Sequence, residues 1–112
     1  MAYTVMFSTV SSDEEAKKIT QALLEEKLVA CVNILPSIES FFWWEGKIDN
    51  AKEILLIIKT LEKNVPFVTK RIKELHSYKV PEIIAVPIVG GNNDYLRWIG
   101  ESISKRGGVN EK

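Results

Sequence analysis

Hydrophobic residues recur along the first part of this chain with two periods, that of a strand and then that of a helix. Residues 3–9 are mostly β-branched or aromatic, a composition that favours a strand. After them, apolar residues recur at the spacing of one helix face: Ala16, Ile19, Leu23 and Leu24. This spacing predicts an amphipathic helix over residues 13–27. Ser12 is a suitable N-cap, and Glu15, three residues later, predicts a capping box.

Three extended segments follow this helix. Residues 28–35 form an apolar run that ends at Pro36. Residues 38–48 carry four consecutive aromatic residues and predict a second extended piece. Residues 53–60 are rich in Ile and Leu and predict a further strand.

The last part of the chain predicts another helix, a strand and a final helix. A helix begins near Val65, because Pro66 in the first turn has no hydrogen bond to lose. Residues 80–89 predict a strand. Pro87 within it indicates an edge strand or a bulge, since proline cannot donate to a sheet ladder. Residues 94–105 predict the final helix.

The predicted order is strand, helix, strand, strand, helix, strand and a final helix. This order is typical of the α+β, ferredoxin-like βαββαβ sandwich, here with an extended central hairpin and an additional C-terminal helix. Right-handed crossovers place the two main helices on one face of the sheet. The length of 112 residues fits one domain over residues 1–112, of which 107–112 are expected to form a flexible tail.

Two of the predicted strands are apolar on both faces. A sheet with helices on one side and water on the other should alternate apolar and polar residues. Residues 54–58 and 83–86 are instead continuously apolar. The face without the main helices therefore needs a cover, because monomers rarely expose large apolar patches. Self-association is the simplest cover, and the alternative is that the final helix covers this face alone.

The aromatic run from Phe41 to Trp44 favours the same conclusion. Alternation along a strand directs Phe41 and Trp43 to one side and Phe42 and Trp44 to the other. Aromatic side chains on both sides suit a protein interface, whereas the competing role is stacking on nucleic-acid bases. The chain carries 15 basic and 15 acidic residues, and its net charge of zero argues against nucleic acid as a partner.

Cysteine usage and the short apolar runs indicate the compartment. Cys31 is the only cysteine, which rules out an intrachain disulfide and fits a reducing environment. The longest apolar runs have about five residues, far short of the roughly 20 that cross a bilayer. The first ten residues lack the basic start and apolar stretch of a signal peptide. We therefore expect a soluble cytoplasmic protein with no membrane partner.

Two residues are candidate metal ligands. Cys31 is either a buried small hydrophobic residue, the commoner case for a free cysteine, or a soft ligand for copper(I) or a similar ion. His76, the only histidine, is either a cation at a helix C-terminus or an imidazole ligand. One cysteine and one histidine cannot form a complete metal site of these two residue types within a single chain. An oligomer could bring His76 of one subunit near Cys31 or the carboxylates of another.

Other polar and aromatic residues are candidates for a ligand cleft. Lys59 is either a lysine that reaches solvent at a strand end or a cation that faces an anion or pairs with Glu82. Tyr78 and Glu82 come just before the last strand, where Glu82 is either a solvated carboxylate or an acid in a pocket. Tyr95 and Trp98, three residues apart on the final helix, are expected to pack together in the core.

The sequence contains no recognisable catalytic constellation. It has no Ser/His/Asp pattern, no GxGxxG and no Walker loop. Acylphosphatases share the fold class but need an arginine in a glycine-rich loop after the first strand, where this chain has Thr9-Val-Ser-Ser12. RNA-recognition motifs share the topology, but their basic-glycine-aromatic signature is absent. We therefore expect no enzymatic activity.

Several segments, taken in order, match the pattern of one protein family. They are Leu28-Val-Ala-Cys-Val-Asn-Ile34, Trp44-Glu-Gly-Lys-Ile48, Ile58-Lys-Thr60, His76-Ser-Tyr78, Pro81-Glu-Ile83 and Tyr95-Leu-Arg-Trp98-Ile99. This set resembles the CutA family, the divalent-cation tolerance proteins, over nearly the whole chain. Ser77 departs from the pattern, because members commonly have proline between the histidine and the tyrosine.

The resemblance implies a ferredoxin-like subunit and a homotrimer in which extended strands pair between subunits. It implies a non-enzymatic role in tolerance to copper and other divalent ions, with no required cofactor. The fold is also similar to that of PII signalling proteins, so the alternative is a PII-like trimer that binds a small anionic molecule between subunits. By position, the family-like residues are Lys59, Tyr78, Glu82, Tyr95 and Trp98 for the cleft and Cys31 and His76 for the metal.

Overall fold

The computed structural model describes residues 1–104, so the predicted tail at 107–112 lies outside the described residues. In chain order the elements are β1 (Tyr3–Val10), α1 (Asp13–Glu25), β2 (Cys31–Trp44), β3 (Lys47–Leu61), a short 3-10 helix (Glu62–Asn64), α2 (Val65–Leu75), β4 (Ile83–Pro87) and α3 (Asn93–Ser104). This order confirms the predicted α+β succession of strands and helices.

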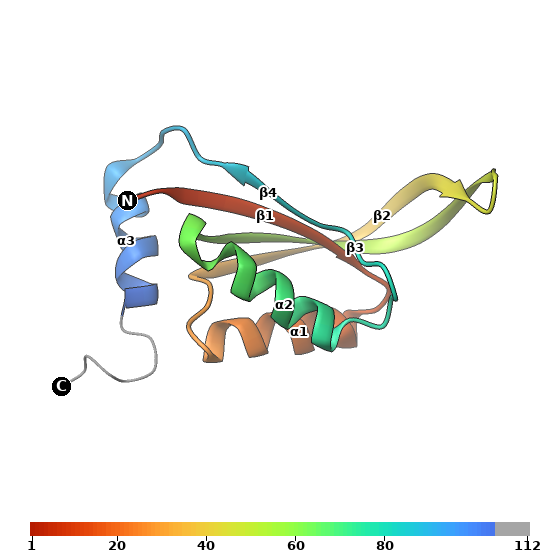
Figure 1. Cartoon of the computed structure of the whole chain (residues 1–112), viewed down its shortest axis with the longest axis horizontal. Helices are drawn as coiled ribbons and strands as arrows, with labels where there is room; N and C mark the ends of the chain where they lie inside the picture. The colour runs from red at the N-terminus through yellow and green to blue at the C-terminus, as the bar shows by residue number, and fades with distance from the viewer. Residues whose placement is uncertain (105–112) are drawn as a thin grey trace.

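The strands form one antiparallel sheet in the order β2-β3-β1-β4. Helices α1 and α2 lie side by side against one face of this sheet (Figure 1). Both features are those of the predicted ferredoxin-like arrangement. β4 is an edge strand, as Pro87 indicates, because no strand pairs with its outer side within the described residues.

The central hairpin is longer and more continuous than predicted. Residues 28–35 and 38–48 were expected to be separate pieces, but most of both belong to β2. The register shifts between Leu35 and Ile38, so Pro36 is accommodated in a bulge and the strand continues. At the turn, Glu45 and Gly46 both have positive φ angles, 49° and 79°, as in tight turns that join hairpin strands. Residues 38–52, the hairpin arm, project beyond the helices at the end opposite α3 (Figure 1).

Two predicted boundaries differ from the structure. α1 ends at Glu25 rather than residue 27, because Lys27 adopts a left-handed conformation with a φ of 58° and Leu28 N–H donates to the Leu23 carbonyl. The last strand covers Ile83–Pro87 rather than residues 80–89. Further back along the chain, His76 is hydrogen-bonded to β1 and Ser77 to α1.

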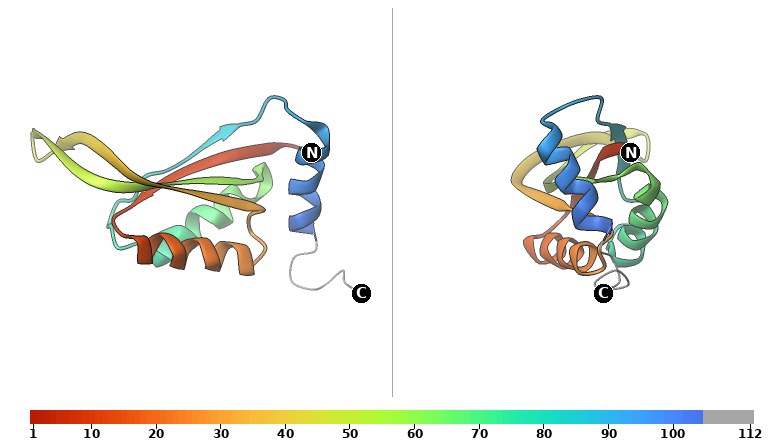
Figure 2. Two further views of the ribbon diagram at one scale, coloured as in Figure 1. Left: turned by 180° about the vertical axis from the view of Figure 1, so that it is seen from behind. Right: turned by 90° about the vertical axis from the view of Figure 1, so that its left-hand side faces the viewer.

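The main core lies between the helices and the sheet. Its fully buried side chains come from β1, β3, α1 and α2: Met6, Val10, Ala16, Ile19, Leu23, Leu56, Ile58, Val68 and Ile72. A second, smaller cluster of Leu61, Ile99 and Ile103 holds α3 across one end of the sheet, beside the N-terminus (Figure 2).

The other face of the sheet is left largely uncovered. Its apolar side chains, here called the open sheet face, are Val5, Phe7, Leu35, Leu55, Ile57, Ile84 and Val86. Leu35, Ile84 and Val86 are 47%, 51% and 46% exposed. Because α3 packs at the end of the sheet, the alternative that this helix alone covers the face does not hold for the single subunit.

Substitutions on the buried and on the exposed side of α1 should differ in their effect on the free energy of unfolding. Leu23→Ala is expected to lower the free energy of unfolding by about 2–5 kcal/mol, because it leaves a cavity in a closed core. Lys18→Ala on the exposed side of the same helix should change it by less than about 0.5 kcal/mol. Urea denaturation followed by circular dichroism at one protein concentration measures both. Equal losses would contradict the assigned core.

Candidate functional site

The predicted site residues fall into two groups at different ends of the sheet. Cys31 pairs with Lys59 across β2 and β3, and Lys59 pairs in turn with Val5 of β1. His76 contacts Thr9, four residues further along β1, or about 13 Å of strand. One subunit therefore does not bring Cys31 and His76 together. Within residues 1–104, no three His, Cys, Asp or Glu side chains are grouped so that they could hold a metal ion.

His76 caps the C-terminus of α2 and has a side chain without solvent exposure. Its Nδ1 accepts a hydrogen bond from the Tyr78 backbone N–H at 3.0 Å, which assigns the ring proton to Nε2. Nε2 then donates to the Thr9 carbonyl at 2.7 Å. Both ring nitrogens therefore have partners, so a metal would bind only by displacing one of them. Its role as a ligand stays a prediction.

Glu15 joins the start of α1 to the segment after α2. The Ser12 hydroxyl accepts from the Glu15 backbone N–H at 3.1 Å, which confirms the N-cap. The Glu15 carboxylate does not complete the predicted capping box at the Ser12 backbone. It accepts instead from the Ser77 backbone N–H at 2.5 Å, the Ser77 hydroxyl at 3.1 Å and Ser11. Burial by itself would raise the pKa of Glu15, but these hydrogen bonds and the nearby His76 lower it overall.

Tyr78 extends this cluster to the base of the hairpin arm. Its hydroxyl donates to Glu53 Oε2 at 2.7 Å, and its ring centroid lies 4.8 Å from that of His76. Burial, followed by the hydrogen bond to Glu53 and the negative charges of Glu53 and Glu15, raises the pKa of Tyr78 to about 12. Sequence reasoning did not place Glu53 in a site. The sequence signal for it is a carboxylate at the start of a strongly apolar stretch. In the structure Glu53 is only 8% exposed, and a buried carboxylate needs a partner.

Glu82 takes no part in this cluster. It is exposed just before β4 and forms no ion pair with Lys59 in the part of the chain that the structure describes. The predicted pairing of these two residues is therefore wrong for the single subunit, because β1 lies between the two strands concerned.

The second group lies where β2 and β3 meet α3. Cys31 is a free, partly exposed thiol rather than a fully buried residue. As cross-strand partners, Cys31 and Lys59 direct their side chains to the same face of the sheet. The Lys59 ammonium donates to Asn33 Oδ1. The Tyr95 side chain hydrogen-bonds that of Cys31. Burial, followed by the influence of Cys31, raises the pKa of Tyr95.

Tyr95 and Trp98 form a stacked pair on α3. Their ring centroids are 5.5 Å apart with an angle of 30° between the planes, which confirms that they pack together. They do not lie in the core as expected, because they remain 41% and 44% exposed. Ile99 and Ile103 occupy the buried side of α3 instead.

The Tyr78 hydrogen bond gives a pH-dependent prediction. A pKa of about 12 in the folded chain, above the ordinary 10, means that folding favours the neutral phenol. Its contribution to stability is complete below pH 10 and is lost as the pH rises through about 12. The absorbance at 295 nm of the native protein minus that of Tyr78→Phe should therefore titrate near pH 12.

The same variant tests the partner carboxylate. At neutral pH, Tyr78→Phe should lower the free energy of unfolding by about 1–3 kcal/mol, because Glu53 loses its donor in a buried position. Tyr3→Phe is the matched control, since the Tyr3 hydroxyl has no hydrogen bond within residues 1–104. A difference titration centred near pH 10 would show that the phenol is free in solution.

No helix among the described residues is long and apolar enough to span a membrane.

Comparison with known proteins relates this geometry to one family. Residues 4–102 match the model of the CutA1 divalent ion tolerance protein. The chain is 46% identical over 98 residues to the divalent-cation tolerance protein CutA of Thermus thermophilus, covering 88% of this chain and 95% of that protein. It is 49% identical over 98 residues to the chloroplastic Protein CutA 1 of Oryza sativa, covering 88% of this chain, but it spans only 55% of that protein's length.

The fold agrees with these relatives. The crystal structure of CutA1 from Oryza sativa is similar with a TM-score of 0.89 at 47% identity, covering 91% of this chain and 94% of that chain. The family match spans nearly all the described residues, including both groups of site residues. The chain therefore belongs to the CutA1 divalent ion tolerance protein family.

Proposed function

We propose that this protein acts in divalent-cation tolerance as a cytoplasmic homotrimer that binds copper or a similar divalent ion and catalyses no reaction. Membership of the family supports the tolerance role. The name of the Thermus thermophilus relative, a divalent-cation tolerance protein, agrees with it. The observation that carries the assembly is the apolar surface that the single subunit leaves in contact with water.

The uncovered surface has two connected parts. One is the open sheet face, which lacks a covering layer. The other is the hairpin arm, on which Phe41 and Trp43 are 69% and 73% exposed. Apolar area on this scale is typical of subunit interfaces rather than of free surfaces. The number of three subunits comes from the family resemblance, since the exposed apolar surface of one subunit supports self-association but not a particular number of subunits.

The proposed metal ligands would have to come from different subunits. Cys31 is the accessible soft ligand, because its thiol is free and partly exposed. His76 lies at the other end of its own sheet, so only a neighbour could bring a second His76 close to Cys31. Binding there would replace either the Tyr78 N–H or the Thr9 carbonyl as a partner of the ring.

A second candidate function is a PII-like signalling trimer that binds a small anionic molecule. Lys59, Tyr95 and Trp98 lie at one end of the sheet, which supports an anion-binding role there. Tyr78 and Glu82 lie near the other end. Two subunits would therefore be needed to bring all five into one cleft.

Native mass spectrometry of metal-stripped protein tests the main proposal. We expect the mass of three chains and the uptake of whole numbers of copper ions at low micromolar concentration. Cys31→Ser and His76→Gln should each lower copper uptake at least about tenfold, since each removes a ligand. Lys17→Gln, on the exposed side of α1, is the matched control and should bind as the native protein does.

The outcomes separate the two parts of the proposal. A monomer at micromolar concentration would contradict the assembly argument. A trimer that takes up no copper, or takes it up equally in all variants, would contradict the metal site and favour the anion-binding candidate.

A further inference from the structure

Within residues 1–104, the Lys59 ammonium has no ion-pair partner. This lysine is only partly exposed and donates to a neutral acceptor, Asn33 Oδ1. Among the described residues the ion pairs are made by Arg71 and Arg97, and the remaining close contact of this kind joins His76 and Glu15, so none includes Lys59. Neither of its cross-strand neighbours, Val5 and Cys31, is an aspartate or a glutamate. A half-buried ammonium in these surroundings favours the approach of an anion.

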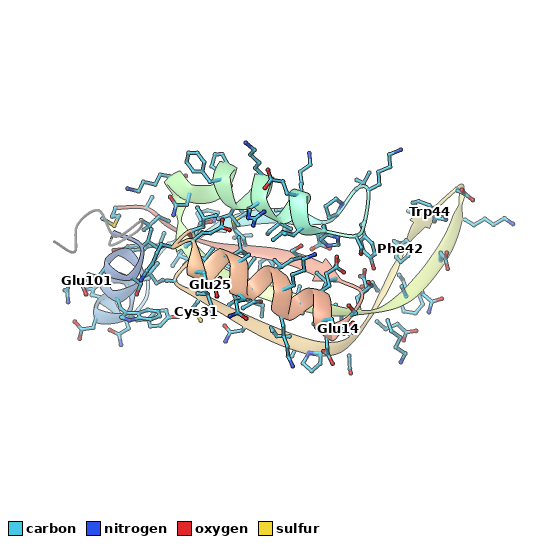
Figure 3. The ribbon with its side chains drawn as sticks, turned by 90° about the horizontal axis from the view of Figure 1, so that it is seen from below. Glu14, Glu25, Cys31, Phe42, Trp44 and Glu101 are labelled. Carbon is cyan, nitrogen blue, oxygen red and sulfur yellow. The ribbon has the colours of Figure 1, made fainter. Side chains whose placement is uncertain are left out.

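An aromatic surface lies next to this charge. Cys31 stands between Lys59, its cross-strand partner, and Tyr95, whose side chain it contacts. Figure 3 shows Cys31 at the start of β2, beside α3. Trp98 stacks on Tyr95, and more than two-fifths of each side chain remains exposed. The stack therefore offers an accessible π surface within one subunit, close to a positive charge.

Asn33 completes the arrangement with a second donor. Its amide oxygen accepts from the Lys59 ammonium. The NH2 group of the same amide is then a second donor beside the ammonium. An oxyanion placed beside Lys59 can therefore accept from both side chains. Charge-assisted hydrogen bonds of this type are stronger than neutral ones.

We propose that Lys59, Asn33 and the stacked Tyr95–Trp98 pair form a binding site for a planar ring that carries a carboxylate or a phosphate. The ring lies against the aromatic pair, and its anionic oxygens accept hydrogen bonds from Lys59 and Asn33. The site rests on the residues of the second candidate function, names its ligand class and draws all its residues from one subunit. Lys59 and Asn33 lie on the open sheet face near α3, so the proposal requires that self-association leave this end of the face accessible. The proposed contacts of this site use neither of the proposed copper ligands, Cys31 and His76, although Cys31 stands beside the site.

Calorimetric titration of the full chain with three naphthalene probes tests the site. We expect 2-naphthoate or 2-naphthyl phosphate to bind at least tenfold more tightly than the neutral 2-naphthylmethanol, since only the anions use Lys59. The comparison between the two anions identifies the preferred acid. Lys59→Met keeps the aliphatic stem and should weaken binding of the better anion at least about tenfold. Lys17→Met, exposed on α1 and away from the open sheet face and the hairpin arm, is the matched control and should bind as the native protein does.

Substitutions on α3 test the aromatic surface separately. Trp98→Leu should weaken binding about tenfold, in the range known for loss of stacking on a base. Tyr95→Phe keeps the ring and should change the affinity by less than about threefold. Masses and thermal melting curves of all variants show whether they fold and assemble like the native chain.

Three results would overturn the proposal. The native protein could bind neither anion, the neutral alcohol could bind as tightly as the anions, or folded Lys59→Met could bind like the native protein. None of these results would alter the subunit count or the copper uptake, so a failure of this site is distinguishable from a failure of the metal-tolerance proposal.

Discussion

The lack of a cover on one face of the sheet is the constraint on which the rest of this molecule depends. Burial of apolar surface contributes about 25 cal/mol per Å², and α1 and α2 supply it on one face only. The opposite face keeps its Ile and Val side chains in contact with water in the single subunit. The hairpin arm adds exposed Phe and Trp side chains beyond the helices. The proposed self-association would cover both parts of this surface with one arrangement.

The polar contacts near the base of the arm have a structural role within the single subunit. The His76 ring is held between Thr9 and Tyr78, and the Glu15 carboxylate accepts from the backbone N–H of Ser77. These bonds fix the segment between α2 and β4. Ser77 contributes an N–H that a proline at this position would lack. The departure from the family pattern therefore adds a bond rather than loosening the turn.

Much of the fold and part of the candidate site follow from local patterns. The strand order is predictable because helix and strand periods differ, and Pro87 identifies the edge strand. The contact between Tyr95 and Trp98 follows from helical spacing, but their exposure does not, because it depends on which side of α3 faces Leu61. Pro36 locally indicates the end of a strand, but in the structure β2 continues through it by means of a bulge.

The sequence by itself determined the elements, the two-faced apolar strands and the family pattern, because these depend on neighbours a few residues apart. The tertiary structure decided which chemical groups meet. Glu15 and Ser77 are 62 residues apart, and Tyr78 and Glu53 are 25 apart. Such contacts depend on strand register and helix docking, which no local spacing encodes. The same register separates Cys31 from His76 and places Cys31 between Lys59 and Tyr95.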